Sequence, residues 1–181
     1  MTKLSVRPLQ EKDIAHIANY ITGLNEDDAL RMGVDKNKCS SKEELMQSLL
    51  EIYHTPLAQT KFFYMIWLVN DQAIGHSALK EIHHGEIANM HLHMWTTEHR
   101  GKGYGGKLFC LSALEFYRLF NLKLILCEPR ATNPMPNNML SKVGFRKWKT
   151  YVAASSELAL PCELNSYIID SEIATNFVDK N

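Results

Sequence analysis

Four glycines lie within residues 100–106 of this 181-residue chain, and this stretch restricts the fold more than any other. An extended-looking segment precedes it and a strongly helical segment follows it. Glycines at this density let backbone N–H groups crowd around a ligand, because no Cβ atoms stand in the way. The following helix turns its unpaired N–H groups and the positive end of its dipole toward the same place. The stretch therefore predicts a cradle for phosphate between a strand and a helix.

The composition is that of an ordinary soluble globular protein. Hydrophobic residues make up 45% of the chain and charged residues 22%, and no run approaches the ~20 apolar residues that a membrane span needs. The N-terminal residues lack the apolar stretch of a secretory signal, so we expect a cytoplasmic protein without a membrane partner. Twenty basic residues balance twenty acidic ones, so we expect no nucleic-acid partner. At this length we expect one domain, residues 1–181.

Hydrophobic periodicity divides the chain into strands and helices. Apolar or alternating runs predict seven strands, at 4–8, 62–69, 73–79, 86–96, 122–127, 145–153 and 165–169. Helical periodicity predicts four helices, at 14–21, 45–53, 105–120 and 136–143. Asp13 and the S-x-x-E pattern from Ser41 are expected to cap the first two helices. We expect loops or short helical turns over 23–41 and a flexible tail over 171–181.

The order of these elements predicts the fold class. It implies an α/β (α+β) domain with a mixed, mostly antiparallel central sheet flanked by helices. The turn at Asn70-Asp71 joins two strands into an antiparallel hairpin. A single β-α-β crossover in the second half of the chain carries the glycine stretch at its first turn, where open sheets commonly bind ligands.

Two nucleotide-binding motifs match these glycines. The pattern Gly101-x-Gly103-x-x-Gly106 fits the dinucleotide fingerprint, and Glu128 follows at about the expected distance. The upstream hairpin is foreign to a Rossmann domain, however, and too little chain follows for its second half. Residues 101–107 also spell most of a P-loop, but Leu108 stands where Ser or Thr should hold magnesium. We set the P-loop aside and keep dinucleotide binding as a minor alternative.

A third motif covers the same residues and has a second motif to support it. Residues 97–105, Thr-Glu-His-Arg-Gly-Lys-Gly-Tyr-Gly, resemble the P-E-Y-R-G-K-G-Y-G segment of the GNAT acyl-CoA N-acetyltransferases. The segment from Asn133 to Phe145 resembles the N-x-x-A-x-x-L-Y-x-K-x-G-F motif of that family and ends as Lys-Val-Gly-Phe. Two motifs at matching separation are more specific than either alone. The resemblance covers about residues 6–152.

The resemblance implies a GNAT-like sheet and acetyl transfer from acetyl-CoA to a primary amine of a small molecule, protein or peptide, by direct attack in a ternary complex. A strand, the glycine loop and a helix would form the CoA site. Cys127-Glu128-Pro129, with Asn137-Asn138, resembles the branch that contains the acetyltransferases of ribosomal-protein N-termini. The residues that would bind the donor are Trp95, Thr96, Arg100, Gly101, Lys102, Gly103, Tyr104, Gly105, Gly106, Asn133 and Asn138.

Candidate proton acceptors lie on the strand before the loop. Alternation places Asn89, His91, His93 and Trp95 on one face. A histidine near its ordinary pKa is suited to taking a proton from an ammonium at neutral pH. His91 matches one of two histidines in arylalkylamine N-acetyltransferases, so it is the predicted base, with His93 and Asn133 beside it in the catalytic set. Alternatively, the histidines are half-buried strand residues or merely line the acceptor pocket.

Metal binding is a weaker interpretation of the same strand. The H-x-H pair could join His76 or His83-His84 around zinc, but no thiol or carboxylate spacing supports this, and we expect no metal. The four cysteines are scattered without a C-x-x-C pair and are expected to be free thiols.

Two positions depart from the family pattern. Leu140 stands where many members carry the tyrosine that protonates the departing thiolate, and Pro136 replaces alanine, which a first helical turn tolerates. Solvent, His93 or Tyr104 would then be the acid, or proximity alone would suffice. The rival hypothesis is a degenerate acyl-CoA-binding module without efficient turnover. A homodimer through the sheet or the segment after Ser171 is compatible with the sequence.

Overall fold

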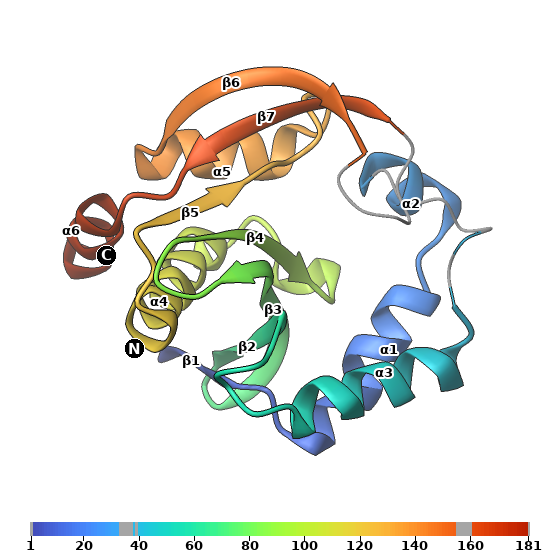
Figure 1. The fold of residues 1–181 in the computed structure, drawn as a ribbon. Helices are drawn as coiled ribbons and strands as arrows, with labels where there is room; N and C mark the ends of the chain where they lie inside the picture. Colours follow the sequence, from blue (N-terminus) through green and yellow to red (C-terminus); the bar gives the residue numbers. More distant parts are fainter. Residues whose placement is uncertain (1, 33–37, 39, 155–160, 181) are drawn as a thin grey trace.

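The computed structural model describes residues 2–32, 38, 40–154 and 161–180 (Figure 1). Seven strands form one sheet in the order β1-β2-β3-β4-β5-β7-β6. They are β1 (Leu4–Pro8), β2 (Phe62–Val69), β3 (Gln72–His83), β4 (Ile87–Met94), β5 (Leu124–Cys127), β6 (Arg146–Ala153) and β7 (Cys162–Ile168). The α-helices are α1 (Ile14–Thr22), α2 (Glu26–Met32), α3 (Lys42–His54), α4 (Tyr104–Phe120), α5 (Pro134–Val143) and α6 (Ser171–Lys180), with 3-10 turns η1 (Glu11–Asp13) and η3 (Thr97–His99).

The sheet has the expected mixed topology. Its neighbouring strands are antiparallel except β4 and β5, which are parallel. Helix α4 connects these two strands, so they form the predicted β-α-β crossover with the glycine stretch at its first turn. At the β2–β3 hairpin, Asn70 and Asp71 have φ of 49° and 65°, as a two-residue type I′ turn requires. The predicted sheet flanked by helices is confirmed.

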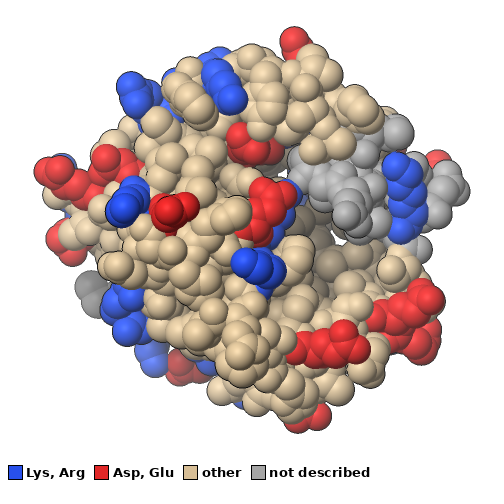
Figure 2. Space-filling model, in the orientation of Figure 1, with Lys and Arg blue, Asp and Glu red and all other residues tan. Residues whose placement is uncertain are grey.

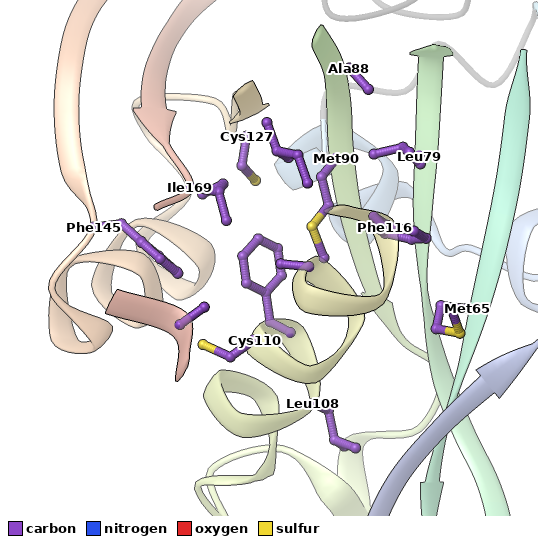
Figure 3. Packing of buried hydrophobic residues seen from close by; sticks show 14 of the residues in the cluster. Met65, Leu79, Ala88, Met90, Leu108, Cys110, Phe116, Cys127, Phe145 and Ile169 are labelled. Carbon is purple, nitrogen blue, oxygen red and sulfur yellow. The ribbon is translucent and has the colours of Figure 1, made fainter. Parts of the chain in front are cut away.

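Helix α4 covers one face of the sheet and forms the larger core. The side chains of Leu79, Met90 and Phe116 are fully buried there, and Figure 3 shows Phe116 on the helix with Leu79 and Met90 on the strands. Burying one such side chain contributes about 1.5–3 kcal/mol. Trp67 lies in the same core, and its Nε1–H points at the hydroxyls of Ser77 and Ser112, each 3.0 Å away. The polar atom of this large ring therefore has partners.

Helices α1 and α3 cover the opposite face of β1 to β3 (Figure 1). Ile17 of α1, Leu49 of α3 and Ile66 of β2 are at most 1% exposed and form a second, smaller core. The Ser41 capping box of α3 is confirmed, because Ser41 Oγ accepts from Glu44 N and Glu44 Oε2 accepts from Ser41 N. None of the described helices is long and apolar enough to cross a membrane.

Asp13 has a different role from the helix cap that the sequence predicts. Its carboxylate is 2% exposed and accepts from both terminal nitrogens of Arg7, at 2.6 and 2.9 Å, and from Gln10 N at 2.9 Å. The pair lowers the pKa of Asp13 and raises that of Arg7. Asp13 therefore ties the first strand to the turn before α1.

Two further elements differ from the predictions. Strand β7 begins at Cys162, before the predicted strand, whereas α2 at residues 26–32 lies within the segment expected to form loops or short helical turns. The predicted flexible tail is instead helix α6, whose Phe177 ring contacts α4. Apolar residues on one side of α6, Ile173, Phe177 and Val178, supply the packing that holds it in place.

Candidate active site

The glycine stretch lies where the chain leaves β4 and enters α4. Gly101 and Gly103 have φ of 74° and 82°, a region that glycine adopts without steric cost. Gly103 is also the residue that precedes α4. A Cβ atom at Gly101, Gly103 or Gly105 would meet nothing within 4 Å. The backbone here is open to a ligand, beside helix N–H groups that have no partner within the helix.

Gly106 lies in the same stretch but is buried. A Cβ atom there would lie 3.2 Å from the Phe177 ring of α6 and 3.3 Å from Val143 Cγ2 of α5. The missing side chain therefore lets α5 and α6 pack against the first turn of α4. The N–H group of Gly106 lies in that first turn. Any contact of Gly106 with the donor would therefore be made by its backbone, and this contact stays a prediction.

Strands β4 and β5 pair over only three residues of β4, Ile87 to Asn89. Strand β4 continues to Met94, whereas β5 ends at Cys127. Beyond Asn89, the edge of β4 that faces β5 has no hydrogen-bonded neighbour among the described strands. This free edge leads to the glycine loop, so it can pair with an extended ligand whose phosphates occupy the loop.

Two buried polar atoms without partners lie on the turn between β5 and α5. Asn133 is 7% exposed, and within the described part of the chain neither its Oδ1 nor Nε of Arg130 has a hydrogen-bond partner. Such an atom costs about 1–3 kcal/mol when nothing pairs with it. One atom accepts and the other donates, as an amide ligand requires. The pantetheine arm of CoA carries amides, so this turn fits the predicted donor.

Sequence reasoning missed the residue that holds this turn. Asn137 Nδ2 donates to the carbonyl oxygens of Arg130 and Asn133, at 2.9 and 2.7 Å. Its Oδ1 accepts from Asn165 Nδ2 of β7 at 2.8 Å. An amide four residues after the helix N-cap was the available signal. Asn138, which the resemblance places near the donor, lies exposed on α5.

The structure connects Arg100 with helix α2. Its Nη1 lies 4.0 Å from Asp28 Oδ1, and its Nη2 donates to the Met94 carbonyl at 3.4 Å. The guanidinium of Arg100 therefore has contacts with Asp28 and Met94 beside the loop. The predicted contact with phosphate would come in addition to these. Lys102 is exposed within the loop. The phosphate contacts of both cations stay predictions.

Some main-chain groups at the end of β4 already have hydrogen-bond partners within the protein. Trp95 N–H donates to the Ile74 carbonyl at 2.9 Å, which removes it from the groups that could bind a donor. The Thr96 hydroxyl lies 2.8 Å from His99 Nδ1. Tyr104 begins α4 and packs against the larger core. Thr96 N–H and the carbonyl of Trp95 are then the main-chain candidates at this position.

Aromatic and imidazole rings gather on the α1 side of β3 and β4. The His76 and His93 ring centroids lie 4.9 Å apart, and the ring of Tyr20 lies 5.7 Å from His93. Trp95 Nε1 donates to His76 Nδ1 at 2.8 Å, so His76 carries its proton on Nε2. We call His76, His91, His93 and Trp95 the histidine wall. The predicted shared face of β4 is confirmed, and His76 joins it because it pairs with His93 in the ladder.

Burial lowers the pKa of every histidine in this wall. The pKa of His93 falls to about 4 through burial. The pKa of His91 falls to about 3 through burial, with Lys80 and His93 adding positive charge nearby. That of His76 falls well below its usual range, again chiefly through burial. All three are neutral at pH 7, which corrects the premise that His91 keeps its ordinary pKa.

Other sequence motifs acquire structural explanations. Leu108 and Leu140 are fully buried in the larger core, so neither position offers a hydroxyl to magnesium or to a thiolate. Glu128, the acidic residue of the dinucleotide pattern, accepts from Tyr151 OH at 2.8 Å. Among the described residues, no group of His, Cys, Asp and Glu is placed to hold a metal ion.

Comparisons with solved structures show where this fold occurs. Spermidine N-acetyltransferase from Vibrio cholerae in complex with CoA and spermine has 20% identity and a TM-score of 0.73, covering 96% of this chain and 98% of that one. A dodecameric structure of that enzyme has 20% identity and a TM-score of 0.69, covering 93% and 94%. An uncharacterized protein from Bacillus halodurans has 13% identity and a TM-score of 0.71, covering 99% and 90%. These likenesses establish the fold.

The family follows from the sequence. A search of curated proteins gives no match. The sequence model of the acetyltransferase (GNAT) domain, however, matches residues 3–146, from the first strand into β6. This match includes the glycine loop, the histidine wall and the Asn133 turn. The chain belongs to the GNAT acetyltransferases, a family of enzymes that use acetyl-CoA as co-substrate.

Proposed function

We propose that this protein acetylates a primary amine of a small cationic molecule by direct attack on acetyl-CoA in a ternary complex. The observation that carries the proposal is the histidine wall, which ends at Trp95, five residues before the glycine loop begins at Arg100. Acetyl-CoA, when bound, supplies an acetyl group activated as a thioester. An amine that attacks it must lose a proton, and neutral imidazoles next to the donor site can accept one.

Within the wall, His93 is better suited to this role than His91. Lys80 contributes to the lowered pKa of His91, because its positive charge opposes a second one on the imidazole. For His93 the cause is burial alone. His93 also lies closer in sequence to the loop and contacts Tyr20 of α1. With a pKa of about 4 in the free protein, His93 would hold the proton only transiently and pass it to solvent.

The surface near the wall favours a cationic acceptor. Figure 2 shows a hollow between the end of β4 and α1, with acidic side chains along α3 at its side. Helix α3 carries exposed carboxylates at Glu43, Glu44 and Glu51. Such charges raise the local concentration of a positively charged ligand. The similar enzyme from Vibrio cholerae was solved with spermine, so polyamines are the first acceptors to test.

Other acceptors and a non-catalytic role are the alternatives. Cys127-Glu128-Pro129 supports a peptide N-terminus as the acceptor, in the branch near the ribosomal-protein acetyltransferases. Leu140 supports an acyl-CoA-binding module with poor turnover, since it removes the phenol that protonates the leaving thiolate. Dinucleotide binding has little support, because β4 and β5 are the one parallel pair among the described strands.

The deciding experiment offers acetyl-CoA with spermidine, spermine, an arylalkylamine and a short peptide, and follows the free thiol of CoA. We expect turnover on at least one polyamine, with the acetylated product confirmed by mass spectrometry. Turnover on the peptide alone would replace the small-molecule proposal. Tight CoA binding without turnover on any amine would favour the binding module. A melting temperature raised by NAD(P) and unaffected by acetyl-CoA would restore the dinucleotide interpretation.

A further inference from the structure

Two buried polar atoms without partners lie on the α1 side of the sheet, where β4 and β5 part. They are Asn89 Oδ1 and Ser166 Oγ, and neither has a hydrogen-bond partner in the described part of the chain. Asn89 is the last β4 residue that pairs with β5. Ser166 is fully buried in β7, and its neighbour Tyr167 contacts Asn137 of α5, so alternation directs Ser166 to the α1 side. Buried polar atoms left unpaired destabilise a protein, so a ligand that pairs with them would bind favourably.

A carboxylate belongs to the segment between these two atoms. Glu128 immediately follows β5, which lies between β4 and β7 in the sheet, and antiparallel pairing places it opposite Ser166. Its Oε1 accepts from Tyr151 OH of β6 at 2.8 Å. Burial, the hydrogen bond to Glu128 and the charges of Glu128 and Glu81 raise the pKa of Tyr151 to about 12. The carboxylates of Glu81 and Glu128, from the two sides of the parting strands, therefore lie near the same phenol.

An irregular backbone aims the side chain of Glu81. Its φ is 52°, a region that residues other than glycine adopt at a cost. The pairing of β3 with β4 shifts between Lys80 and His83, and such a bulge redirects a side chain. Glu81 Oε2 accepts from Asn89 Nδ2, and Glu81 Oε1 lies 3.7 Å from Lys80 Nζ. The Glu81 side chain is 59% exposed, so a ligand can reach this carboxylate beside the unpaired oxygen of Asn89.

These groups fit a ligand that donates hydrogen bonds and carries positive charge. An amide oxygen such as Asn89 Oδ1 only accepts, so its partner must be a donor. An ammonium group offers three donors and forms the stronger, charge-assisted bonds with carboxylates. Two cations of the protein lie nearby, Lys80 beside Glu81 and Lys149 at 4.5 Å from the Tyr151 ring centroid. They balance the carboxylates in the free protein, and a bound ammonium would compete with Lys80 for Glu81.

We call the groups that surround this position the distal site: Glu81, Asn89, Glu128 and Ser166. Asn89 and His93 lie on one face of β4, four residues apart, which is roughly 13 Å at about 3.3 Å per residue. One ammonium group cannot contact both. We propose that the distal site holds a second cationic group of the acceptor while the amine to be acetylated lies at His93. This inference rests on the proposed function, and it makes the acceptor a linear diamine or polyamine rather than a monoamine.

The test titrates the CoA-bound protein with spermine and with the monoamine butylamine. Glu81→Gln should weaken spermine binding by about 10-fold or more, because a charge-assisted hydrogen bond is lost, and leave butylamine binding unchanged. Glu86→Gln is the matched control, since it removes the same charge from an exposed residue just before β4, and it should bind spermine as the parent does. Equal losses in Glu81→Gln and Glu86→Gln, or an equal loss for butylamine, would overturn the distal site.

Glu81→Gly distinguishes a ligand-binding role from a structural one. Glycine adopts a φ of 52° without steric cost, so this variant should melt no lower than the parent. It should nevertheless lose spermine affinity to the same extent as Glu81→Gln. A Glu81→Gly protein that melts at a lower temperature and binds spermine as tightly as the parent would give Glu81 a structural role and contradict the proposal.

A kinetic measurement separates this inference from the proposed function. If spermine is acetylated, Glu81→Gln should raise its KM by about 10-fold and leave kcat within about 2-fold, while the KM of butylamine stays as in the parent. A fall in kcat on both amines would mean that Glu81 acts on the reacting amine, which contradicts a site for a second charge. If no amine is acetylated, the proposed function fails, whereas the titration still decides whether the distal site binds a second cationic group.

Discussion

Alternate residues of β3 and β4 face two environments, an apolar core on one side of the sheet and a row of imidazoles on the other. On the α4 side, Leu79 and Met90 are fully buried among apolar side chains. On the α1 side, the tilted rings of His76 and His93 lie 4.9 Å apart, and burial lowers the pKa of His93 to about 4. The same strands thus place a packed core one residue away from a row of neutral imidazoles. Neighbouring positions in the sequence should respond to substitution in opposite ways.

The difference explains how a strand can be precise at its functional side. Met90, Leu92 and Met94 pack against the larger core, which fixes the backbone between them and hence the direction of His91 and His93. A site on a rigid element keeps its geometry better than one on a loop. Stability should therefore reside mainly on the α4 side, and chemistry on the α1 side.

The largest effect on stability is expected for Phe116→Ala. The ring is fully buried under α4 and packs edge-on against Phe63, with centroids 6.3 Å apart. Its loss leaves a cavity and should lower the free energy of unfolding by about 3–5 kcal/mol. Glu115→Ala on the same helix removes only the exposed pair with Arg118 and should cost less than about 1 kcal/mol. Urea unfolding of the two variants measures the contrast, and similar losses would contradict it.

The opposite response is expected for His93→Asn. This change should lower kcat on the order of 100-fold, while the free energy of unfolding changes by roughly 1 kcal/mol. His83→Asn, at the exposed end of β3, should leave kcat as in the parent. His91→Asn should have the smaller effect of the two wall variants. If His91→Asn instead reduces kcat more, the base is His91, as the resemblance alone suggested.

The sequence predicted one face of β4 well and its electrostatics badly. Alternation was enough to place His91, His93 and Trp95 together, because side-chain direction in a strand has period two. The pKa values could not be predicted, since the burial comes from α1 and Tyr20, which are distant in sequence. Similarly, a two-residue contact such as Arg100 with Asp28 leaves no periodic signal.

The glycine loop shows the same limit within seven residues. Spacing identified Gly101, Gly103 and Gly106 equally, yet Gly106 is buried against Phe177, seventy-one residues later in the chain. A motif is defined by the spacing of nearby residues, so it cannot predict a contact with a residue this distant in the sequence. The family resemblance could therefore be recognised from the loop together with the motif from Asn133 to Phe145, whereas the separate reasons for the glycines required the fold.

Substitutions at Gly105 and Gly106 test this difference between an open and a packed glycine. Gly105→Ala adds a methyl group where nothing lies within 4 Å and should stabilise the helix by up to about 1 kcal/mol. The added methyl group should nevertheless weaken CoA binding, because it narrows the cradle. Gly106→Ala must displace Phe177 and should be less stable than Gly105→Ala by about 1–3 kcal/mol. Thermal unfolding and CoA titration check both variants; a Gly106→Ala protein as stable as Gly105→Ala would contradict the packing role.

The last expected effect is on the pH dependence of stability, and it is absent at neutral pH. The pKa of His93 falls from the ordinary 6.5 to about 4 on folding, so between these pH values the unfolded chain binds more protons than the folded one. Stability should then be fully present above pH 6.5 and decline as the pH falls toward 4, by at most about 1.4 kcal/mol per pH unit for each such histidine. His93→Asn should make this decline less steep, because one titrating group is gone. His91 and His76 still contribute, so part of the decline should remain. Urea unfolding at several pH values between 4.5 and 7.5 measures the slopes, and a slope unchanged by His93→Asn would mean that burial does not hold this imidazole neutral.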